Sequence, residues 1–242
     1  MNRLSLTVMK NRHGRYGGYS LKREDMIAGY AGKLLRERFG KGPESIYVSA
    51  DDRSVSMHIR NFLGPVEHFL LSQSEEQSFR QIRELLMKSL LPELKHYLLN
   101  EAGFEAREVY YDWGIHNASG MIVALAPDNR GAGECYPGRE EAEAQMIAVS
   151  ERIQKAPDRI YSWWPNRRTL LIVREGILIA IERELIGLGY EQILKSTKRK
   201  LEKRHLEHET AFDRLFGRKL ADFYVDWDFE LDKSVTVYSF QP

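Results

Sequence analysis

The sequence lacks several features that would place a protein in a functional class at once. Cys135 is its only cysteine, which excludes an internal disulfide and any metal site built from several cysteines. Uninterrupted apolar runs, such as residues 177–181, are far shorter than the roughly 20 residues that span a bilayer. Acidic and basic residues nearly balance, with a net charge of +1, so no overall field attracts nucleic acid. These absences predict a soluble, cytoplasmic protein.

Recognisable catalytic and cofactor motifs are absent from the sequence as well. It contains no Ser/His/Asp order, no phosphate-binding glycine loop and no dinucleotide fingerprint. Gly131 and Gly133 are not followed by the lysine and the strand–turn–helix that a phosphate-binding loop needs. We therefore predict no catalytic residue, no cofactor and no enzymatic activity.

What the sequence does contain is the same pattern twice. Residues 36–47 read RERFGKGPESIY and residues 150–161 read SERIQKAPDRIY, with six of the twelve positions identical. A pattern that returns after 114 residues is a small domain used twice, because solenoid repeats are much shorter. The residue pairs at this spacing include Lys41/Lys155, Pro43/Pro157, Arg60/Arg174, Asp112/Asp226 and Trp113/Trp227.

Hydrophobic periodicity predicts the same order of elements in each half: helix, hairpin, long helical stretch, hairpin. In the first half Ser20 begins a helix that Gly40 ends, and Gly64-Pro65 begins the long stretch, which Pro92 kinks. The expected buried stripe of that stretch is Phe79, Ile82, Leu85, Leu86, Leu90, Leu94 and Tyr97. The predicted hairpins cover residues 46–59, 109–125, 160–173 and 222–240.

These elements predict an α+β fold of two tandem αββαββ units, each an antiparallel sheet covered by a long helix. Two such units in one chain would bury matching surfaces against each other, as an intrachain pseudo-dimer. We place the first unit at residues 20–126 and the second, more diverged unit at 141–242, with a linker at 127–140. Residues 1–19 are basic and contain no acid, and we expect them to form a flexible leader.

Two short motifs and a strand aspartate resemble one known family. Residues 40–43 read GKGP before the first hairpin, residues 63–67 read LGPVE after it, and Asp112 lies in a later strand. This combination resembles the MpsC family, the small soluble component of the Na⁺-translocating membrane-potential-generating system. The likeness covers about residues 23–126 well and residues 141–240 more loosely, so the chain resembles a tandem form of the family.

The resemblance implies a non-enzymatic accessory or regulatory protein that acts by protein–protein contact. The implied partners are a membrane subunit resembling a proton-pumping antiporter and a carbonic-anhydrase-like soluble subunit, which together support membrane potential or inorganic-carbon uptake. Such a protein would lie in the cytoplasm or peripherally at the membrane, and the sequence is compatible with a homo-oligomer. An alternative class, a small-ligand or nucleic-acid sensor, is suggested by the basic run at 198–204 and by the aromatic hairpins.

Asp112 and Asp226 are the main candidate site residues. Each lies in an apolar or aromatic strand beside a tryptophan, where a buried carboxylate is costly unless it is hydrogen-bonded or paired. Arg60 and Arg174 are the expected partners. Two roles stay open: a structural aspartate that fixes the strands, and a binding carboxylate. Further candidates for binding or structural roles are Glu67, Glu182, Trp113, Trp227, Lys41 and Pro43.

His205 and His208 are a weak candidate for a metal site, with Glu202 one turn earlier. Their spacing matches neither orientation of the zinc-protease helix motif, so we predict no metal site there. We expect this helix, including the neighbouring basic run, to present an exposed face of intrahelical charge pairs.

Overall fold

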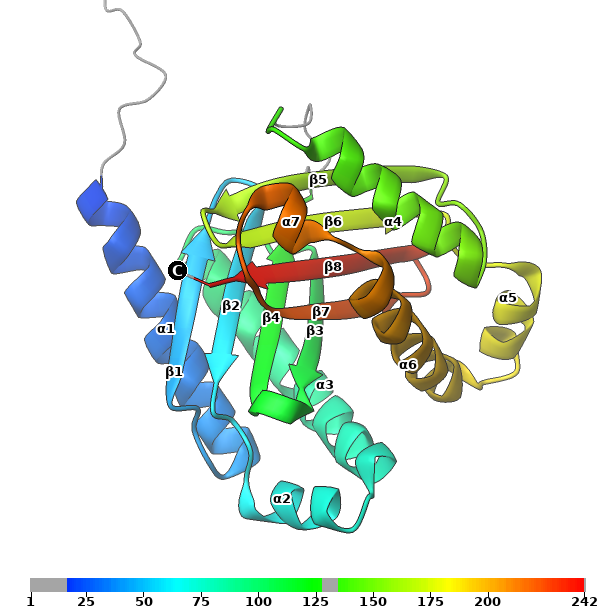
Figure 1. Cartoon of the computed structure of the whole chain (residues 1–242). Coiled ribbons are helices and arrows are strands. Elements are labelled where there is room, and N and C mark those ends of the chain that lie inside the picture. Colours follow the sequence, from blue (N-terminus) through cyan, green and yellow to red (C-terminus); the bar gives the residue numbers. More distant parts are fainter. Residues whose placement is uncertain (1–16, 128–134, 242) are drawn as a thin grey trace, which may run out of the picture.

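The computed structural model describes residues 17–127 and 135–241, which form two units of the same construction (Figure 1). The first unit runs α1 (Gly17–Phe39), β1 (Ser45–Ala50), β2 (Ser54–Arg60), α2 (Pro65–Ser72), α3 (Glu76–Asn100), β3 (Glu108–Gly114), a short 3₁₀ helix (Ile115–Asn117) and β4 (Ser119–Leu125). The second runs α4 (Arg139–Ile153), β5 (Arg159–Asn166), β6 (Thr169–Glu175), α5 (Ala180–Gly187), α6 (Glu191–Glu209), α7 (Phe212–Phe216), β7 (Leu220–Asp228) and β8 (Lys233–Phe240).

Each unit contributes one four-stranded antiparallel sheet, and the two sheets have the same strand order. The order is β1-β2-β4-β3 in the first sheet and β5-β6-β8-β7 in the second. The second hairpin of each unit therefore inserts its last strand beside the second strand of the first hairpin. The predicted α+β fold with two similar units is confirmed.

The two sheets pack face to face, and β4 shows how the sequence arranges this. Because successive strand residues point to opposite faces, its side chains divide between two cores. Met121, Val123 and Leu125 join a cluster between the sheets, whereas Ile122 and Ala124 join the cluster under the helices. Every residue of β4 is buried, which explains its nearly continuous apolar sequence.

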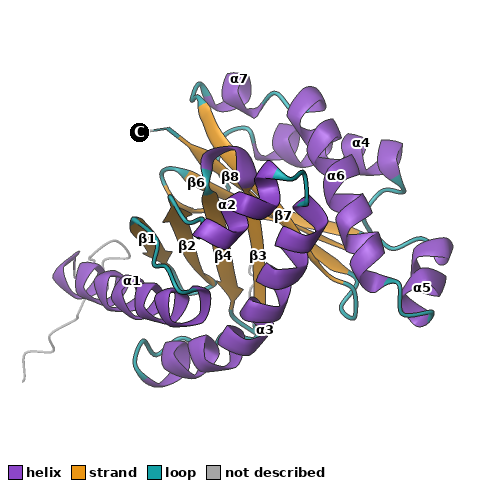
Figure 2. Ribbon diagram, turned by 90° about the horizontal axis from the view of Figure 1, so that it is seen from below, coloured by secondary structure: helices purple, strands orange, loops and turns teal. Residues whose placement is uncertain are grey.

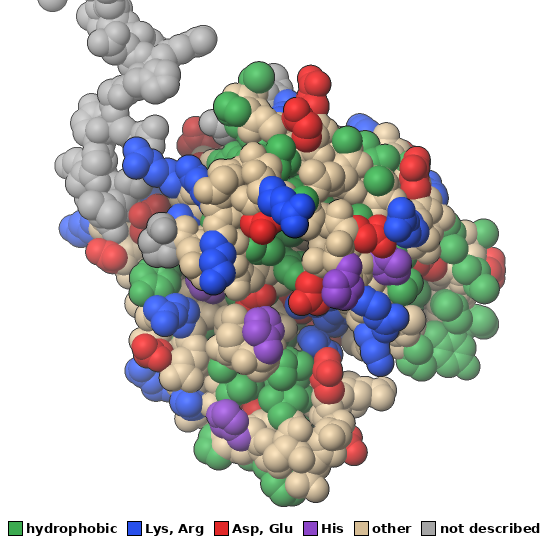
Figure 3. Space-filling model, viewed as in Figure 1, with side chains coloured by type: hydrophobic (Ala, Val, Ile, Leu, Met, Phe, Trp, Pro, Cys, Tyr) green, Lys and Arg blue, Asp and Glu red, His purple; other side chains and the backbone are tan. Residues whose placement is uncertain are grey.

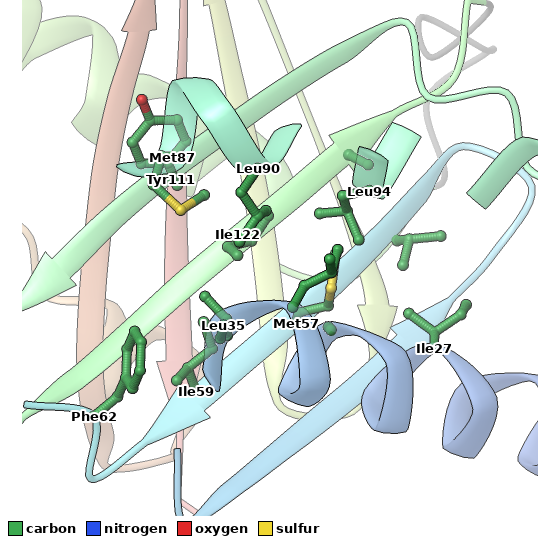
Figure 4. Packing of buried hydrophobic residues seen from close by; sticks show 14 of the residues in the cluster. Ile27, Leu35, Met57, Ile59, Phe62, Met87, Leu90, Leu94, Tyr111 and Ile122 are labelled. Atoms are coloured by element: carbon green, nitrogen blue, oxygen red, sulfur yellow. The ribbon is translucent and has the colours of Figure 1, made fainter. Parts of the chain in front are cut away.

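Helices cover the outer face of each sheet, so the molecule has four layers in the order helix, sheet, sheet, helix (Figures 1 and 2). In the first unit α1 and α3 supply one side of the core, with Ile27, Leu35, Leu90 and Leu94 against the sheet residue Met57 (Figure 4). The described residues of the second unit use α4, α6 and α7 on its sheet in the same way.

Several predicted boundaries shift by a few residues. Helix α1 begins at Gly17 rather than Ser20, so residues 17–19 extend the helix instead of belonging to a leader. The rest of the predicted leader lies outside the described residues, as does most of the predicted linker. Helix α4 begins at Arg139, just inside the span given to the linker.

The long helical stretch of the first unit is two helices, α2 and α3, and that of the second is three, α5, α6 and α7. Between α2 and α3 the chain turns through Ser74, at a φ of 61°, and between α5 and α6 it turns through Gly189, at a φ of 81°. The left-handed conformation costs glycine little free energy, whereas a residue with a Cβ is strained in it. Helix α3 also buries Arg83 and exposes 68% of Leu85, so the predicted apolar stripe is wrong at that point.

The two units differ by one residue in the turn of the first hairpin. Three residues, 51–53, connect β1 to β2. The matching segment of the second unit, residues 165–168, is one residue longer, and its first two residues belong to the irregular end of β5. Ser45 pairs with Arg60, and Arg159 pairs with Glu175. The residue that matches Arg174 is consequently Ile59. The predicted equivalence of Arg60 and Arg174 is wrong, and since a shift of one residue moves a strand side chain to the other face, the two arginines point to opposite faces.

Candidate functional site

Asp112 on β3 and Asp226 on β7 lie where the edges of the two sheets meet. The backbone N–H of Val225 donates to Asp112 Oδ2 at 3.2 Å, and the backbone N–H of Tyr111 donates to Asp226 Oδ2 at 2.8 Å. Each aspartate thus accepts a hydrogen bond from the strand of the other unit, one residue before the other aspartate. The two contacts are reciprocal, as across a two-fold axis.

A second pair of cross-unit contacts lies at the start of the same strands. Lys233 Nζ reaches Glu108 Oε2 at 2.8 Å, and at the matching place Ser119 Oγ donates to Asp222 Oδ2 at 2.9 Å. Asn117 Nδ2 also donates to Asp222, at 2.8 Å. The sequence spacing of 114 residues therefore has a physical counterpart, because each unit supplies the other with the same kind of polar contact.

Four basic side chains from α3 and α6 surround the two aspartates. Asp112 lies 2.6 Å from Lys203 Nζ, 2.9 Å from Arg199 Nε and 3.7 Å from Arg80 Nη1. Asp226 lies 2.8 Å from Lys195 Nζ and 3.6 Å from Arg199 Nη2. Arg199 therefore bridges the carboxylates of both units. Arg80 and Lys195 occupy matching turns of the two long helices. Because their separation is close to the 114-residue repeat, the sequence could have indicated this basic pair.

The two aspartates differ in charge balance. Burial raises the pKa of Asp112, but Lys203, Arg199 and Arg80 outweigh it and lower that pKa to about 2. At Asp226 burial outweighs Lys195 and Arg199, so its pKa is raised. The first carboxylate is held ionised, whereas the second is the weaker acid.

Arg60 and Arg174, the expected partners of the aspartates, lie elsewhere in the structure. Arg174 is buried on the helix side of β6, where its guanidinium donates to Glu202 at 2.5 Å, to Ser150 at 2.9 Å and to Ser234 at 3.0 Å. Arg60 is exposed at the end of β2. The prediction that these arginines pair with the aspartates is wrong, because the bases come from helices that sequence spacing alone does not bring to the strands.

Glu67 and Glu182 occupy equivalent places at the start of α2 and α5. Glu67 accepts from the backbone N–H of Gly64 at 2.7 Å, and Glu182 accepts from that of Ile179 at 3.1 Å. Each is also paired with a buried base, Arg83 at 2.6 Å and Lys198 at 2.8 Å, respectively. A carboxylate that caps its helix and neutralises a base of the next helix holds the two helices together.

The remaining candidates divide between the core and the surface. Trp113 and Trp227 are buried, and the Trp227 Nε1–H donates to Glu202 at 3.2 Å. Lys41 donates to the carbonyl oxygen of Leu63 at 2.9 Å, tying the GKGP segment, including the half-buried Pro43, to the chain before α2. None of these contacts brings Lys41 or Pro43 near the aspartates.

The basic helix is exposed only in part, at residues such as Lys200 and Arg204, and not along the whole basic run as we expected. Lys198 and Arg199 are buried, at 3% and 9% exposure, and both serve ion pairs inside the protein. His205 Nδ1 lies 2.6 Å from Glu209, whereas His208 is exposed. Within the described residues no three His, Cys, Asp or Glu side chains are grouped so as to hold a metal ion.

The space beside the aspartates is too small for a ligand. A cavity between the sheets, lined by both carboxylates, measures about 10 Å³, room for no more than one water molecule. With both acids bonded to backbone amides and surrounded by bases, the arrangement can fix the two units but offers no free nucleophile or general base.

Fold and contacts together define a class, a two-unit α+β protein whose halves are joined by reciprocal carboxylate contacts. Residues 20–126 match the sequence model of the MpsC family, described as the Na⁺-translocating membrane potential-generating system. The match covers the first unit, where the GKGP and LGPVE segments lie. No curated protein and no solved structure matches the chain. Across the described residues, every helix is too short or too polar to cross a lipid bilayer.

Proposed function

We propose that this protein is a non-enzymatic accessory component of a Na⁺-translocating, membrane-potential-generating system and acts by contact with protein partners. The observation that carries the proposal is the match of residues 20–126 to the MpsC family. The partners we propose are an antiporter-like membrane subunit and a carbonic-anhydrase-like subunit, in a system that also supports inorganic-carbon uptake. In this proposal the second unit is a diverged MpsC-like copy that acts as a scaffold for the first.

Exposed apolar side chains support a contact function. Val66 and Phe69 lie on α2, with 62% of Phe69 exposed, and Ile181 and Leu188 lie on and just after α5, with 69% of Leu188 exposed. Figure 3 shows hydrophobic side chains gathered over α5. Such side chains on two equivalent helices, at separate corners of the molecule, are typical of a protein-binding surface.

The buried basic helix weighs against the nucleic-acid alternative. Lys195, Lys198 and Arg199 neutralise Asp226, Glu182 and Asp112, so they are not available to phosphates on a nucleic-acid backbone. The alternative of a nucleic-acid sensor thus loses part of the basic run that suggested it, since Lys200 and Arg204 alone of its bases are exposed.

The proposal is tested in cells of the organism that encodes the protein. Deleting the gene should lower the membrane potential reported by a potential-sensitive dye, and the wild-type gene should restore it. The double variant Val66→Ser/Phe69→Ser should fail to restore it, because the substitutions remove the apolar contact without touching the core. Leu99→Ser, at another exposed apolar position, is the matched control and should restore the potential. An unchanged potential on deletion contradicts the proposal.

A further inference from the structure

A large cleft opens between the two units, away from the paired aspartates. Its volume is about 690 Å³, within the range of small-molecule sites, and both units line it. Tyr47, His58 and Arg60 come from β1 and β2 of the first unit, whereas Arg167 and Arg168 come from the β5–β6 turn of the second. The C-terminal end of β8 forms part of the wall.

The cleft is rich in positive charge that the protein itself does not neutralise. Within the described residues, no carboxylate forms an ion pair with Arg60, Arg167 or Arg168, in contrast to the buried bases of α6. Glu24 is the one acid in the described lining, and it accepts a hydrogen bond from the backbone N–H of Ala50 at 3.1 Å. An exposed guanidinium is common, but three of them around one concave surface provide a strong local attraction for anions.

The pKa values of two other side chains in the cleft respond to the same positive field. A hydrogen bond from Arg60 lowers the pKa of the Tyr47 hydroxyl, and the charge of Arg168 acts in the same direction. Burial lowers the pKa of His58, with Arg60 and Arg168 adding to the effect and Asp222 opposing it. Arginines of both units therefore act on the same two residues, so the charges of both units face the same cleft.

At the equivalent place at the other end of the inter-sheet space, the protein pairs its own charges. There the residues that match His58 and Arg60 are Val173 and Glu175, and Glu175 lies 3.7 Å from Lys233 and 2.9 Å from Arg159. Ion pairs within the protein fill that end. The cleft has basic residues in place of the acid, and no carboxylate of the described residues pairs with them.

We propose that this cleft binds a small molecule through a phosphate group. Guanidinium groups match phosphate oxygens in bidentate geometry, and a dianion with several acceptor oxygens uses three arginines better than a single carboxylate does. Thr169 in the lining adds a hydroxyl donor, since its Oγ1 accepts from Asn166 Nδ2 at 3.1 Å and keeps its own hydrogen. The cleft is larger than a phosphate ion, and the apolar side chains of Val48, Met121 and Phe240 in its wall leave space for the uncharged part of the ligand.

Isothermal titration calorimetry of the full chain with inorganic pyrophosphate, at constant ionic strength, tests the inference. We expect saturable binding of one pyrophosphate per chain, weakened about tenfold or more by Arg60→Gln and by Arg168→Gln. Both arginines are exposed, so these variants should keep the wild-type melting temperature. Arg204→Gln, at an exposed arginine on α6 outside the cleft, is the matched control and should bind as the wild type does.

Three outcomes would overturn the inference: no saturable binding at millimolar pyrophosphate, binding unaffected by both cleft variants, or equal weakening by Arg204→Gln. Malonate, a dicarboxylate of similar size, should bind much more weakly; equal affinity would refute a phosphate site. Titration with inorganic phosphate, ADP and a sugar phosphate then distinguishes the source of the phosphate group. We expect ADP or the sugar phosphate to bind more tightly than inorganic phosphate, because the organic part then occupies the apolar wall.

Discussion

At one matching place in the core, the first unit is apolar and the second is charged. Ile59 and Met87 are fully buried under the helices of the first unit, whereas Arg174 and Glu202 at the matching positions form a buried ion pair with a distance of 2.5 Å. A similar fold thus tolerates two solutions. The charged one requires hydrogen-bond partners, and the second unit supplies them from Ser150, Ser234 and Trp227.

A parallel difference holds where the two units make the same contact with different bases. Glu67 of the first unit pairs with Arg83, whose guanidinium lies 4.2 Å from the centre of the Trp113 ring and 4.8 Å from that of Phe79. Glu182 of the second unit pairs with Lys198, and within the described part of the chain no aromatic ring lies against that lysine's ammonium group. Planar arginine suits an aromatic core and lysine suits a carboxylate network, so the surroundings select the base.

The largest effect should come from breaking the charged pair of the second unit. Glu202→Met copies the residue of the first unit but leaves Arg174 buried without its carboxylate, which should cost about 3–5 kcal/mol. Adding Arg174→Ile completes the apolar pair and should restore most of that stability, since buried ion pairs can often be replaced by apolar residues of similar volume. Urea unfolding of the wild type, both single variants and the double variant measures the coupling.

If the double variant is as unstable as the sum of the two single variants, the units are not interchangeable at this place. The matching apolar pair of the first unit would then be specific to its own surroundings.

The second prediction compares the two aspartates. Asp112→Asn should destabilise the protein by about 3 kcal/mol, because it leaves Lys203 and Arg199 without the carboxylate that neutralises them. Asp226→Asn should cost less, about 2 kcal/mol, because two bases, Lys195 and Arg199, rather than three face that carboxylate, and burial raises its pKa. The free energies of unfolding from urea titrations at neutral pH test the ranking. A larger loss for Asp226→Asn would contradict the assigned charge balance.

The pH dependence of the unfolding free energy should reveal the contribution of the ionised Asp112. Its pKa is lowered from the model-compound value of 3.8 to about 2 in the folded state, so the unfolded state binds the proton first as pH falls. The stabilisation by the ionised form is complete above pH 3.8 and is lost as pH falls through about 2, a change of about 2 kcal/mol. The stability advantage of the wild type over Asp112→Asn should shrink accordingly.

Urea titrations of both proteins over this acidic range measure that advantage. A constant or growing difference between them would show that Asp112 is not the group whose protonation is linked to unfolding.

The sequence predicted the two-unit fold well because its signals are local and repeated. Alternating strands, Gly64-Pro65 before α2 and Gly40 after α1 indicate elements without any knowledge of tertiary contacts. Residues such as Ile82 and Leu85 did not follow the predicted stripe, because the helix buries Arg83 instead. A periodic pattern cannot reveal that a buried carboxylate, Glu67, compensates this arginine.

The candidate site was predicted in part. The spacing of Asp112 and Asp226 indicated equivalent strand positions, and the reciprocal backbone contacts are found there. The partners of Asp112 could not be predicted, because Arg199 and Lys203 come from a helix about 90 residues further along the chain. The one-residue difference in the hairpin turn also made Arg60 look like the match of Arg174 in the sequence. Register changes of this kind become visible only once the strand pairing is known.

The smallest effect is expected where the two units agree. Arg38 on α1 lies 2.8 Å from Glu93 on α3, and Arg152 on α4 lies 3.2 Å from Glu209 on α6, so each unit joins its outer helices by one such pair. Arg38 and Arg152 are both exposed to solvent, and exposed pairs contribute little because water screens them and the side chains lose entropy. Arg38→Ala and Arg152→Ala should each change the thermal midpoint by less than about 2 °C. A shift of several degrees in one variant alone would show that the units use this outer contact differently. Equal small shifts would show that the units differ in their buried charges and not in this outer contact.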